Sequence, residues 1–260
     1  ATVSRAARVG TLTAPLGPGP EDLIDRGNAV HVRIARSLES RPLAAVFAGA
    51  NLAAVGSAAG TWELIQFREA DLVGPDEYRL TGLLRARLGS EEAMAAGHPA
   101  GSLFVLIGGG VVPLPLGRGA LGRTATLRVT PAGGDPSRVG TLTPLQSTGR
   151  GLRPLSPVHV TARRRPDGAI RIAWVRRTRV GGDGWAGEVP LGEETERYRV
   201  DILDGAAVVR TLETGAPAAL YAAGDQIDDF GAPPATLRLR VAQVAPGYGA
   251  GTAREVECDV

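Results

Sequence analysis

The sequence predicts an all-β fold in two domains: a β-rich domain over residues 1–154, then an antiparallel sandwich over residues 155–260. The 260 residues include 36 glycines and 19 prolines but only one methionine, which is typical of many turns and few long helices. Short segments alternate between apolar and polar residues in both halves. A stretch rich in proline and glycine over residues 131–157 separates the two halves, so we place the boundary near residue 154.

In the first half, alternation over residues 30–34 predicts a half-buried strand. Residues 62–64 and 78–80 continue the same alternation on either side of Gly74-Pro75-Asp76, whose proline and aspartate favour a chain reversal. We therefore expect a hairpin in which Trp62 and Leu64 lie on the same face as Tyr78 and Leu80.

A short helix is predicted directly after this hairpin. Ser90 is a candidate N-cap, Glu91 and Glu92 are acids in the first turn, and Gly97 with Pro99 ends the helix. The apolar run over residues 103–107 follows, and its lack of alternation predicts a strand buried on both faces.

In the second half, Ile170, Ile172 and Trp174 share one phase, so Trp174 is expected to anchor a core. Five short segments alternate in this way within about a hundred residues, and only two stacked sheets can bury all of their apolar faces. These segments are 158–162, 170–174, 198–202, 237–241 and 256–258.

Two blocks of the sequence resemble a known family. The first consists of Trp62, Glu63, Gln66, Phe67, Gly74, Pro75, Tyr78, Arg79, Leu80, Leu83, Leu84 and Arg85. The second is Leu152-Arg153-Pro154-Leu155-Ser156-Pro157-Val158-His159. Both resemble the C-terminal part of the large baseplate hub protein (megatron-like tail protein) of gene transfer agents and siphophage-like tails. The chain departs from the family where the pattern has Leu-Leu-Arg-Gly and then Gly-Thr-Glu: here Ala86 stands, followed by Gly89-Ser90-Glu91.

The resemblance implies a structural component of a virion, assembled in the bacterial cytoplasm and located at the tail tip or baseplate. There it would connect the tail tube to host-attachment or penetration parts during DNA delivery. The implied partners are other copies of the chain, other tail and baseplate proteins, and a host cell-surface glycan.

The second half also resembles a fibronectin type III module. A proline precedes its first strand, Trp174 lies on the second, and Tyr198 begins the third. A Gly-Tyr-Gly turn at residues 247–249 precedes the last strand. Two departures are visible: leucines replace the aromatic residue expected on the sixth strand, and the loop between Trp174 and Tyr198 is long.

No catalytic, cofactor-binding or metal-binding constellation emerges from the residues. Gly117-Arg118-Gly119-Ala120-Leu121-Gly122 fits a dinucleotide fingerprint, but neither a strand nor a helix flanks it convincingly, so a loop is expected. Three histidines at positions 31, 98 and 159 are scattered, and we expect surface or turn roles for each. The single cysteine, Cys258, is expected to be a small buried hydrophobe of the last strand.

Acidic residues leave one enzymatic alternative open. Two carboxylates can hydrolyse a glycan, and candidates are Glu91 with Glu92, and Glu193, Glu194 and Glu196. We expect the first pair to be helix-start acids and the second group to be a solvated loop, and Asp225, Asp228 and Asp229 to form a polar helical turn. The chain is therefore predicted not to be an enzyme, the alternative being a cell-wall glycan hydrolase or a carbohydrate-binding module.

Charge and hydropathy restrict the partners further. The net charge is +2, which gives no basis for sequence-specific nucleic-acid binding, and no apolar run approaches the roughly 20 residues of a membrane span. The chain begins at Ala1 without a visible signal peptide, so we expect it to be processed or part of something longer. A tryptophan among glycines in the long loop is expected either to fold back on the sandwich, the slightly favoured alternative, or to form a contact surface with another chain. The candidate contact residues are Trp185, Tyr248, Arg176, Arg177 and Arg179.

Overall fold

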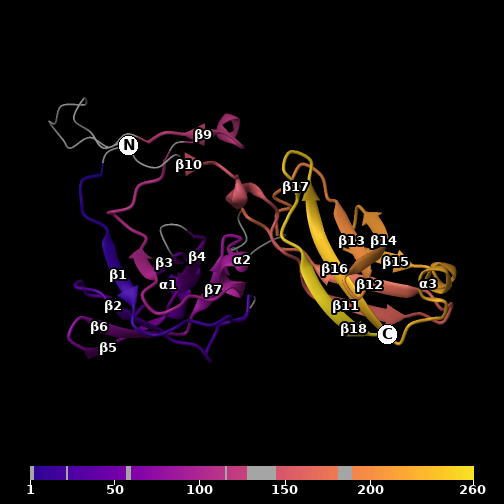
Figure 1. Cartoon of the computed structure of the whole chain (residues 1–260), viewed down its shortest axis with the longest axis horizontal. Helices are drawn as coiled ribbons and strands as arrows, with labels where there is room; N and C mark the ends of the chain where they lie inside the picture. Colours follow the sequence, from indigo (N-terminus) through magenta and orange to yellow (C-terminus); the bar gives the residue numbers. More distant parts are fainter. Residues whose placement is uncertain (1–2, 22, 57–59, 115, 128–144, 181–188) are drawn as a thin grey trace.

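The computed structural model describes residues 3–21, 23–56, 60–114, 116–127, 145–180 and 189–260. Within these residues the chain is all-β, and every strand pairing is antiparallel. Two hydrophobic cores form, one from residues 12–106 and the other from residues 160–260. The N-terminal part lies on the left of Figure 1 and the C-terminal module on the right.

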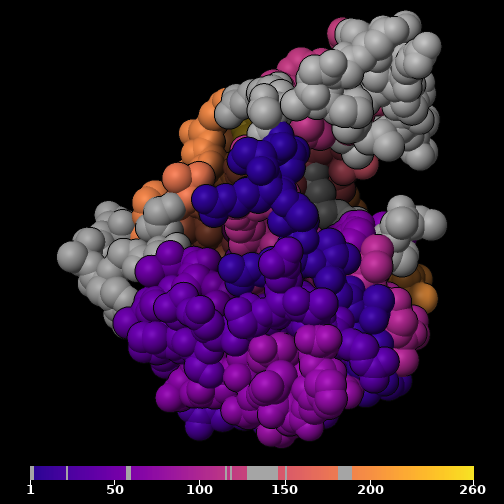
Figure 2. Space-filling view, turned by 90° about the vertical axis from the view of Figure 1, so that its left-hand side faces the viewer, coloured from indigo at the N-terminus to yellow at the C-terminus, as the bar shows by residue number. Residues whose placement is uncertain are grey.

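The N-terminal domain contains an eight-stranded sheet with the order β5-β6-β2-β1-β8-β3-β4-β7. Its core is largely aliphatic, with Phe67 and Phe104 packed at a ring-centre distance of 6.5 Å. Figure 2, seen from this side, shows the indigo to magenta residues as a continuous rounded surface. The elements are β1 (Arg8–Leu12), β2 (Val30–Arg33), α1 (Leu43–Phe47), β3 (Leu52–Gly56), β4 (Trp62–Gln66), β5 (Glu69–Gly74), β6 (Glu77–Thr81), β7 (Leu84–Arg87), α2 (Glu91–Ala95) and β8 (Leu103–Leu106).

The expected hairpin exists, but its first strand was assigned wrongly. The turn at residues 74–76 joins β5 to β6, whereas β4 pairs with β3 and β7. The inward phase of β4 was also wrong: Glu63 and Ile65 are buried, while Trp62 and Leu64 are half-buried. A buried ion pair at Glu63 explains the error, because alternation rules assume that charged residues face solvent.

Two further expectations for this domain need correction. The short helix α2 is present, but the Ser90 side chain does not cap it. Instead, Ser90 Oγ donates to Arg87 O at 2.8 Å and accepts from Leu64 N at 2.9 Å, so it joins two strands of the sheet. Strand β8 lies inside the sheet, yet only Phe104 of its four residues is fully buried, so it is not covered on both faces.

Short elements connect the two domains. The fingerprint-like glycine segment forms a loop with one 3-10 turn, η1, followed by a two-stranded ribbon, so the dinucleotide-binding context is absent from the part described. The ribbon lies above the large sheet in Figure 1. The connecting elements are η1 (Arg118–Ala120), β9 (Thr124–Ala125), β10 (Leu145–Gln146) and η3 (Arg150–Leu152).

The C-terminal module is a sandwich of two sheets with the orders β11-β12-β15 and β14-β13-β16-β18, and the short β17 pairs with β16. Its first, second and fifth long strands form one sheet, and the other four form the second, which is the fibronectin type III arrangement. Trp174, Ile170 and Ile172 face the core as predicted. The elements are β11 (Val158–Arg164), β12 (Ile170–Val175), β13 (Tyr198–Asp204), β14 (Ala207–Thr214), β15 (Ala218–Tyr221), α3 (Ala223–Phe230), β16 (Thr236–Ala245), β17 (Gly249–Ala250) and β18 (Arg254–Asp259).

Candidate functional site at the domain junction

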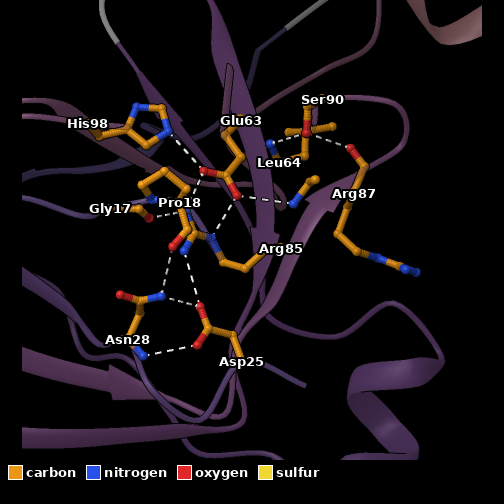
Figure 3. A network of polar contacts seen from close by, with 11 residues as sticks. Gly17, Pro18, Asp25, Asn28, Glu63, Leu64, Arg85, Arg87, Ser90 and His98 are labelled. Atoms are coloured by element: carbon orange, nitrogen blue, oxygen red, sulfur yellow. Dashed lines mark hydrogen bonds and ion pairs between the residues drawn. The ribbon is translucent and has the colours of Figure 1, made fainter. Parts of the chain in front are cut away.

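A buried polar network lies under the part of the N-terminal domain that faces the C-terminal module. Its centre is Arg85 of β7, only 2% exposed. Arg85 Nε donates to Glu63 Oε1 at 2.8 Å and its second terminal nitrogen to Glu63 Oε2 at 3.0 Å, a two-bond fork (Figure 3). The remaining terminal nitrogen donates to Asp25 Oδ2 at 3.2 Å. Such forked pairing fixes orientation as well as charge.

Glu63 takes part in four hydrogen bonds of the network. Besides Arg85, it accepts the backbone N–H of Ala86 at 3.1 Å, and His98 Nε2 lies 2.9 Å from its second oxygen. Because a carboxylate only accepts, the imidazole must carry its proton on Nε2. Burial raises the pKa of Glu63, but the bonds from His98 and Arg85 outweigh burial and hold that pKa below its ordinary value.

Asp25 is held in the same ionised state. Burial raises its pKa, but donation from Asn28, Gly27 and Arg85 lowers it further than burial raises it. Asn28 also donates to Pro18 O at 3.1 Å, which closes the lower part of the network in Figure 3. All the oxygens of these two acids therefore have donors, as a buried charged cluster requires.

The network joins the two halves of the sequence block that resembles the tail hub family. Glu63 belongs to the Trp-Glu-x-x-Gln-Phe half and Arg85 to the Leu-Leu-Arg half. Gln66, from the first half, is buried and donates to Val46 O and Ala50 O, at 2.5 and 2.8 Å. Glu63, Gln66 and Arg85 of the block are thus explained by folding, since each satisfies buried groups contributed by other segments.

The chain after Arg85 has an unusual backbone. Ala86 and Leu88 have φ values of 50° and 55°, and Gly89 follows with 82°. Left-handed conformations are costly for residues with a Cβ atom. The structure therefore gives a reason for the glycine that the family has at the position of Ala86. Positive φ values at Ala86 and Leu88 flank Arg87, which is half-buried, and the Leu88 side chain is exposed. The Arg87 guanidinium has no hydrogen-bond partner among the described residues.

This strained segment forms one wall of a cleft between the two domains, with a volume of about 360 Å³. The other wall consists of residues 176–179 and Val189 of the long loop that follows β12. The wall residues include five arginines at positions 85, 87, 176, 177 and 179. Clefts at domain junctions with convergent polar groups are common binding sites.

Four of these five arginines are already paired inside the chain. Arg177 donates to Glu91 Oε1 at 2.7 Å and to Ser156 O at 2.6 Å. Arg179 donates to Glu193 at 2.6 Å, and Arg176 donates to the carbonyls of Val189 and Pro190 at 2.6 and 2.8 Å. The predicted contact arginines therefore organise the loop and the junction, which leaves Arg87 as the lining arginine without a described partner.

Two predicted contact residues remain, Tyr248 and Trp185. Tyr248 is half-buried and lines a second cavity of about 250 Å³ together with Arg179 and Glu193. The end of the long loop and the turn before the last strand therefore lie together. Trp185 lies outside the described residues.

Sequence reasoning missed three buried residues. His98 was expected in a surface loop but is 6% exposed and bonded to Glu63, and Glu91 was expected as a solvated helix acid but is 5% exposed and paired with Arg177. Glu193 was likewise expected in a solvated loop, yet its side chain is 7% exposed beside Arg179. Their partners are 14 to 86 residues away in the sequence, so no local pattern could have identified them.

Other sequence candidates have ordinary surroundings. His159 is exposed and His31 half-buried, and Cys258 packs half-buried against the second core. The aspartates near residue 225 lie on α3, as expected, where Asp229 accepts from Arg210 and Tyr221. Among the residues that the structure describes, no group of three or more histidine, cysteine or acidic side chains could hold a metal ion. No helix in that part is long and apolar enough to cross a membrane.

Comparisons with known proteins give one family match. Residues 7–105 match the family model "Rcc01698-like, C-terminal". The matched segment contains the eight-stranded sheet and the complete Glu63–Arg85 network but none of the C-terminal module. No curated protein matches the chain.

Among solved structures, the similar chains contain fibronectin domains. A two-domain fibronectin type III segment of chicken tenascin is 10% identical, with 96% of this chain and 99% of that chain covered and a TM-score of 0.29. The FN1–FN3 domains of chicken CNTN1 are 12% identical, with 94% and 65% covered and a TM-score of 0.29. The FN5 domain of Drosophila Lar is 16% identical, with 41% and 98% covered and a TM-score of 0.23.

Proposed function

We propose that this protein is a structural component of a phage-like tail tip or baseplate, connecting the tail tube to host-attachment or penetration parts during DNA delivery. The observation that carries the proposal is the family match over residues 7–105, to a family named after a protein associated with gene transfer agents. The block that resembles the large baseplate hub protein lies within the matched residues. The proposed location is the tail tip of the particle.

The architecture supports an assembly role. Two separately packed β domains are joined through a junction of ion pairs. Both groups of acids considered for glycan hydrolysis include a member paired with arginine: Glu91 with Arg177, and Glu193 with Arg179. Each of these two carboxylates is thus held by an arginine of the same chain.

The partners belong to the same proposal. A hub component would contact further copies of itself in closed symmetry and neighbouring tail proteins. The cavity at Arg179 and Tyr248 is the described part of the candidate contact surface for a protein or a host glycan, and Trp185, also predicted for that surface, lies outside the described residues. Tryptophan, tyrosine and arginine are the residue types enriched at interface hot spots.

Labelling of purified particles tests the proposal. An epitope tag placed after Val260 should be found by immunogold microscopy at the distal end of the tail, and untagged particles provide the control. Absence of the tag from purified particles, or its presence only on the head, would contradict the assignment.

The glycan-hydrolase alternative has its own test. The purified chain should release no reducing ends from peptidoglycan. Release that disappears in Glu91→Gln or Glu193→Gln would show that the chain is an enzyme, and an exposed acid changed in the same way, Glu39→Gln, is the matched control.

A further inference from the structure

Among the interactions of the described residues, two ion pairs connect the N-terminal domain to the C-terminal module. Glu91 of α2 pairs with Arg177 at 2.7 Å, and Glu21 pairs with Arg254 of β18 at 3.1 Å. In both, the acid comes from the first domain and the arginine from the second. A backbone hydrogen bond from Thr252 N to Pro154 O, at 3.3 Å, attaches the residues just before β18 to the linker, which is the segment between η3 and β11 (residues 153–157).

The Glu91–Arg177 pair differs from an ordinary surface pair. Glu91 is 5% exposed, and its Oε2 is buried without a hydrogen-bond partner among the described residues. Among the described residues, Arg177 is therefore the cation that compensates the negative charge of Glu91. A buried charge that loses its counter-charge is strongly destabilised, so separating the domains is costly unless water reaches Glu91.

Arg177 also fixes the linker. Its Nε donates to Ser156 O while a terminal nitrogen contacts Glu91, so one side chain contacts the linker and the first domain from a position in the second. The guanidinium group suits this role, because its donors are arranged in a rigid plane.

We propose that Glu91 and Arg177 form a latch that holds the two domains in the arrangement that encloses the junction cleft, and that its release lets the C-terminal module move about the linker near Pro154. The cleft depends on this arrangement because Arg87 and Leu88 on one wall belong to the first domain, whereas Arg176 and Val189 on the other belong to the second. Release further exposes the guanidinium of Arg87, which has no partner among the described residues, beside the apolar side chain of Leu88. This inference concerns domain orientation and holds whether or not the chain is a tail component.

Distance measurements between spin labels on the full chain test the latch. Cys258 is first changed to serine, and labels are attached to cysteines introduced at two exposed positions, Val73 on β5 and Val208 on β14. The parent should give one narrow distance distribution. Arg177→Gln and Glu91→Gln should each raise the ratio of open to closed molecules by about tenfold, equivalent to about 1.4 kcal/mol.

A matched control and a folding check complete the design. Arg163→Gln changes an exposed arginine of β11 and should leave the distribution narrow. Melting curves establish whether each variant is folded. If Arg177→Gln unfolds, the outcome is decided by Glu91→Gln, because glutamine matches glutamate in size and shape more closely than it matches arginine. A broad distribution in the parent, or folded latch variants that remain as narrow as the parent, would overturn the proposal.

Discussion

At the scale of single residues, the Glu63–Arg85 pair links the sequence block that resembles the tail hub family to the fold. Each oxygen of Glu63 accepts from Arg85, and Ala86 N and His98 Nε2 complete its shell. Breaking a buried pair of this kind leaves an uncompensated charge, which costs far more than losing an exposed pair. The pair therefore holds β4, β7 and the chain before β8 together.

Glu63→Gln should lower the free energy of unfolding by about 3 kcal/mol, because Arg85 loses a charged partner in a site without water access. Urea unfolding measures the change. Glu39→Gln, which removes an exposed pair with Arg41, should cost less than about 1 kcal/mol. Equal costs for the two variants would show that the network adds no stability.

Acid should weaken the same network. The pKa values of Glu63 and Asp25 are lower in the folded chain than their ordinary values of 4.5 and 3.8. A depressed folded pKa contributes stability that is complete above the unfolded pKa and is lost as the pH falls through the folded pKa. Stability should therefore fall as the pH drops below about 4.5, and Glu63→Gln should show a smaller fall. The same acid dependence in both would contradict this assignment.

Ala86 offers the opposite change, a gain in stability. Its φ of 50° is strained for alanine but not for glycine. Ala86→Gly should raise the free energy of unfolding by up to about 1 kcal/mol. Ala70→Gly, on a strand without this conformation, should lower it by about 0.5–1 kcal/mol. A loss at both positions would mean that Ala86 is not strained in solution.

At the scale of elements, the alternating side chains of β12 that face inward, Ile170, Ile172 and Trp174, form part of the core of the C-terminal module. Trp174 is buried and meets Tyr198 edge to face, with ring centres 5.0 Å apart. It connects the two sheets, because β12 belongs to one and β13 to the other.

Trp174→Ala should cost about 3–5 kcal/mol, enough to unfold the module when it is isolated. Thermal melting followed by circular dichroism measures this loss. A melting temperature within a few degrees of the parent would exclude Trp174 from the core.

How much the sequence could predict differs between the two domains. Alternation identified β12, β13 and β16 because the inward residues of the predicted segments, 170–174, 198–202 and 237–241, are apolar or aromatic. It failed at β4, where the buried phase contains Glu63, and it passed over β14 and β15, where exposed valine and leucine interrupt the pattern. The candidate site could be predicted even less well from the sequence, because the partners of Glu63, Glu91 and His98 come from distant segments. Only the folded chain brings these residues together.

At the scale of the whole molecule, the two cores share no residue. The sequence places the division near residue 154, and every member of the second core lies beyond that position. Among the described residues, the junction instead consists of ion pairs and one backbone bond, beside a cleft that both Gly89 and Leu155 line. Such a junction fixes an orientation but is not needed to complete either core.

Residues 155–260 should therefore fold when expressed alone. A cooperative thermal transition and a β-type circular dichroism spectrum are expected, because the sandwich contains its own core. An unfolded fragment would contradict both the boundary near residue 154 and the independence of the module.

The most direct test of the central claim is a cryo-electron microscopy map of an intact phage-like particle that contains this chain. The account predicts density at the distal end of the tail that fits the eight-stranded sheet domain and, adjoining it, the fibronectin-like sandwich. Tail-tip density that fits neither domain, together with detection of the chain elsewhere in the particle or outside it, would contradict the account.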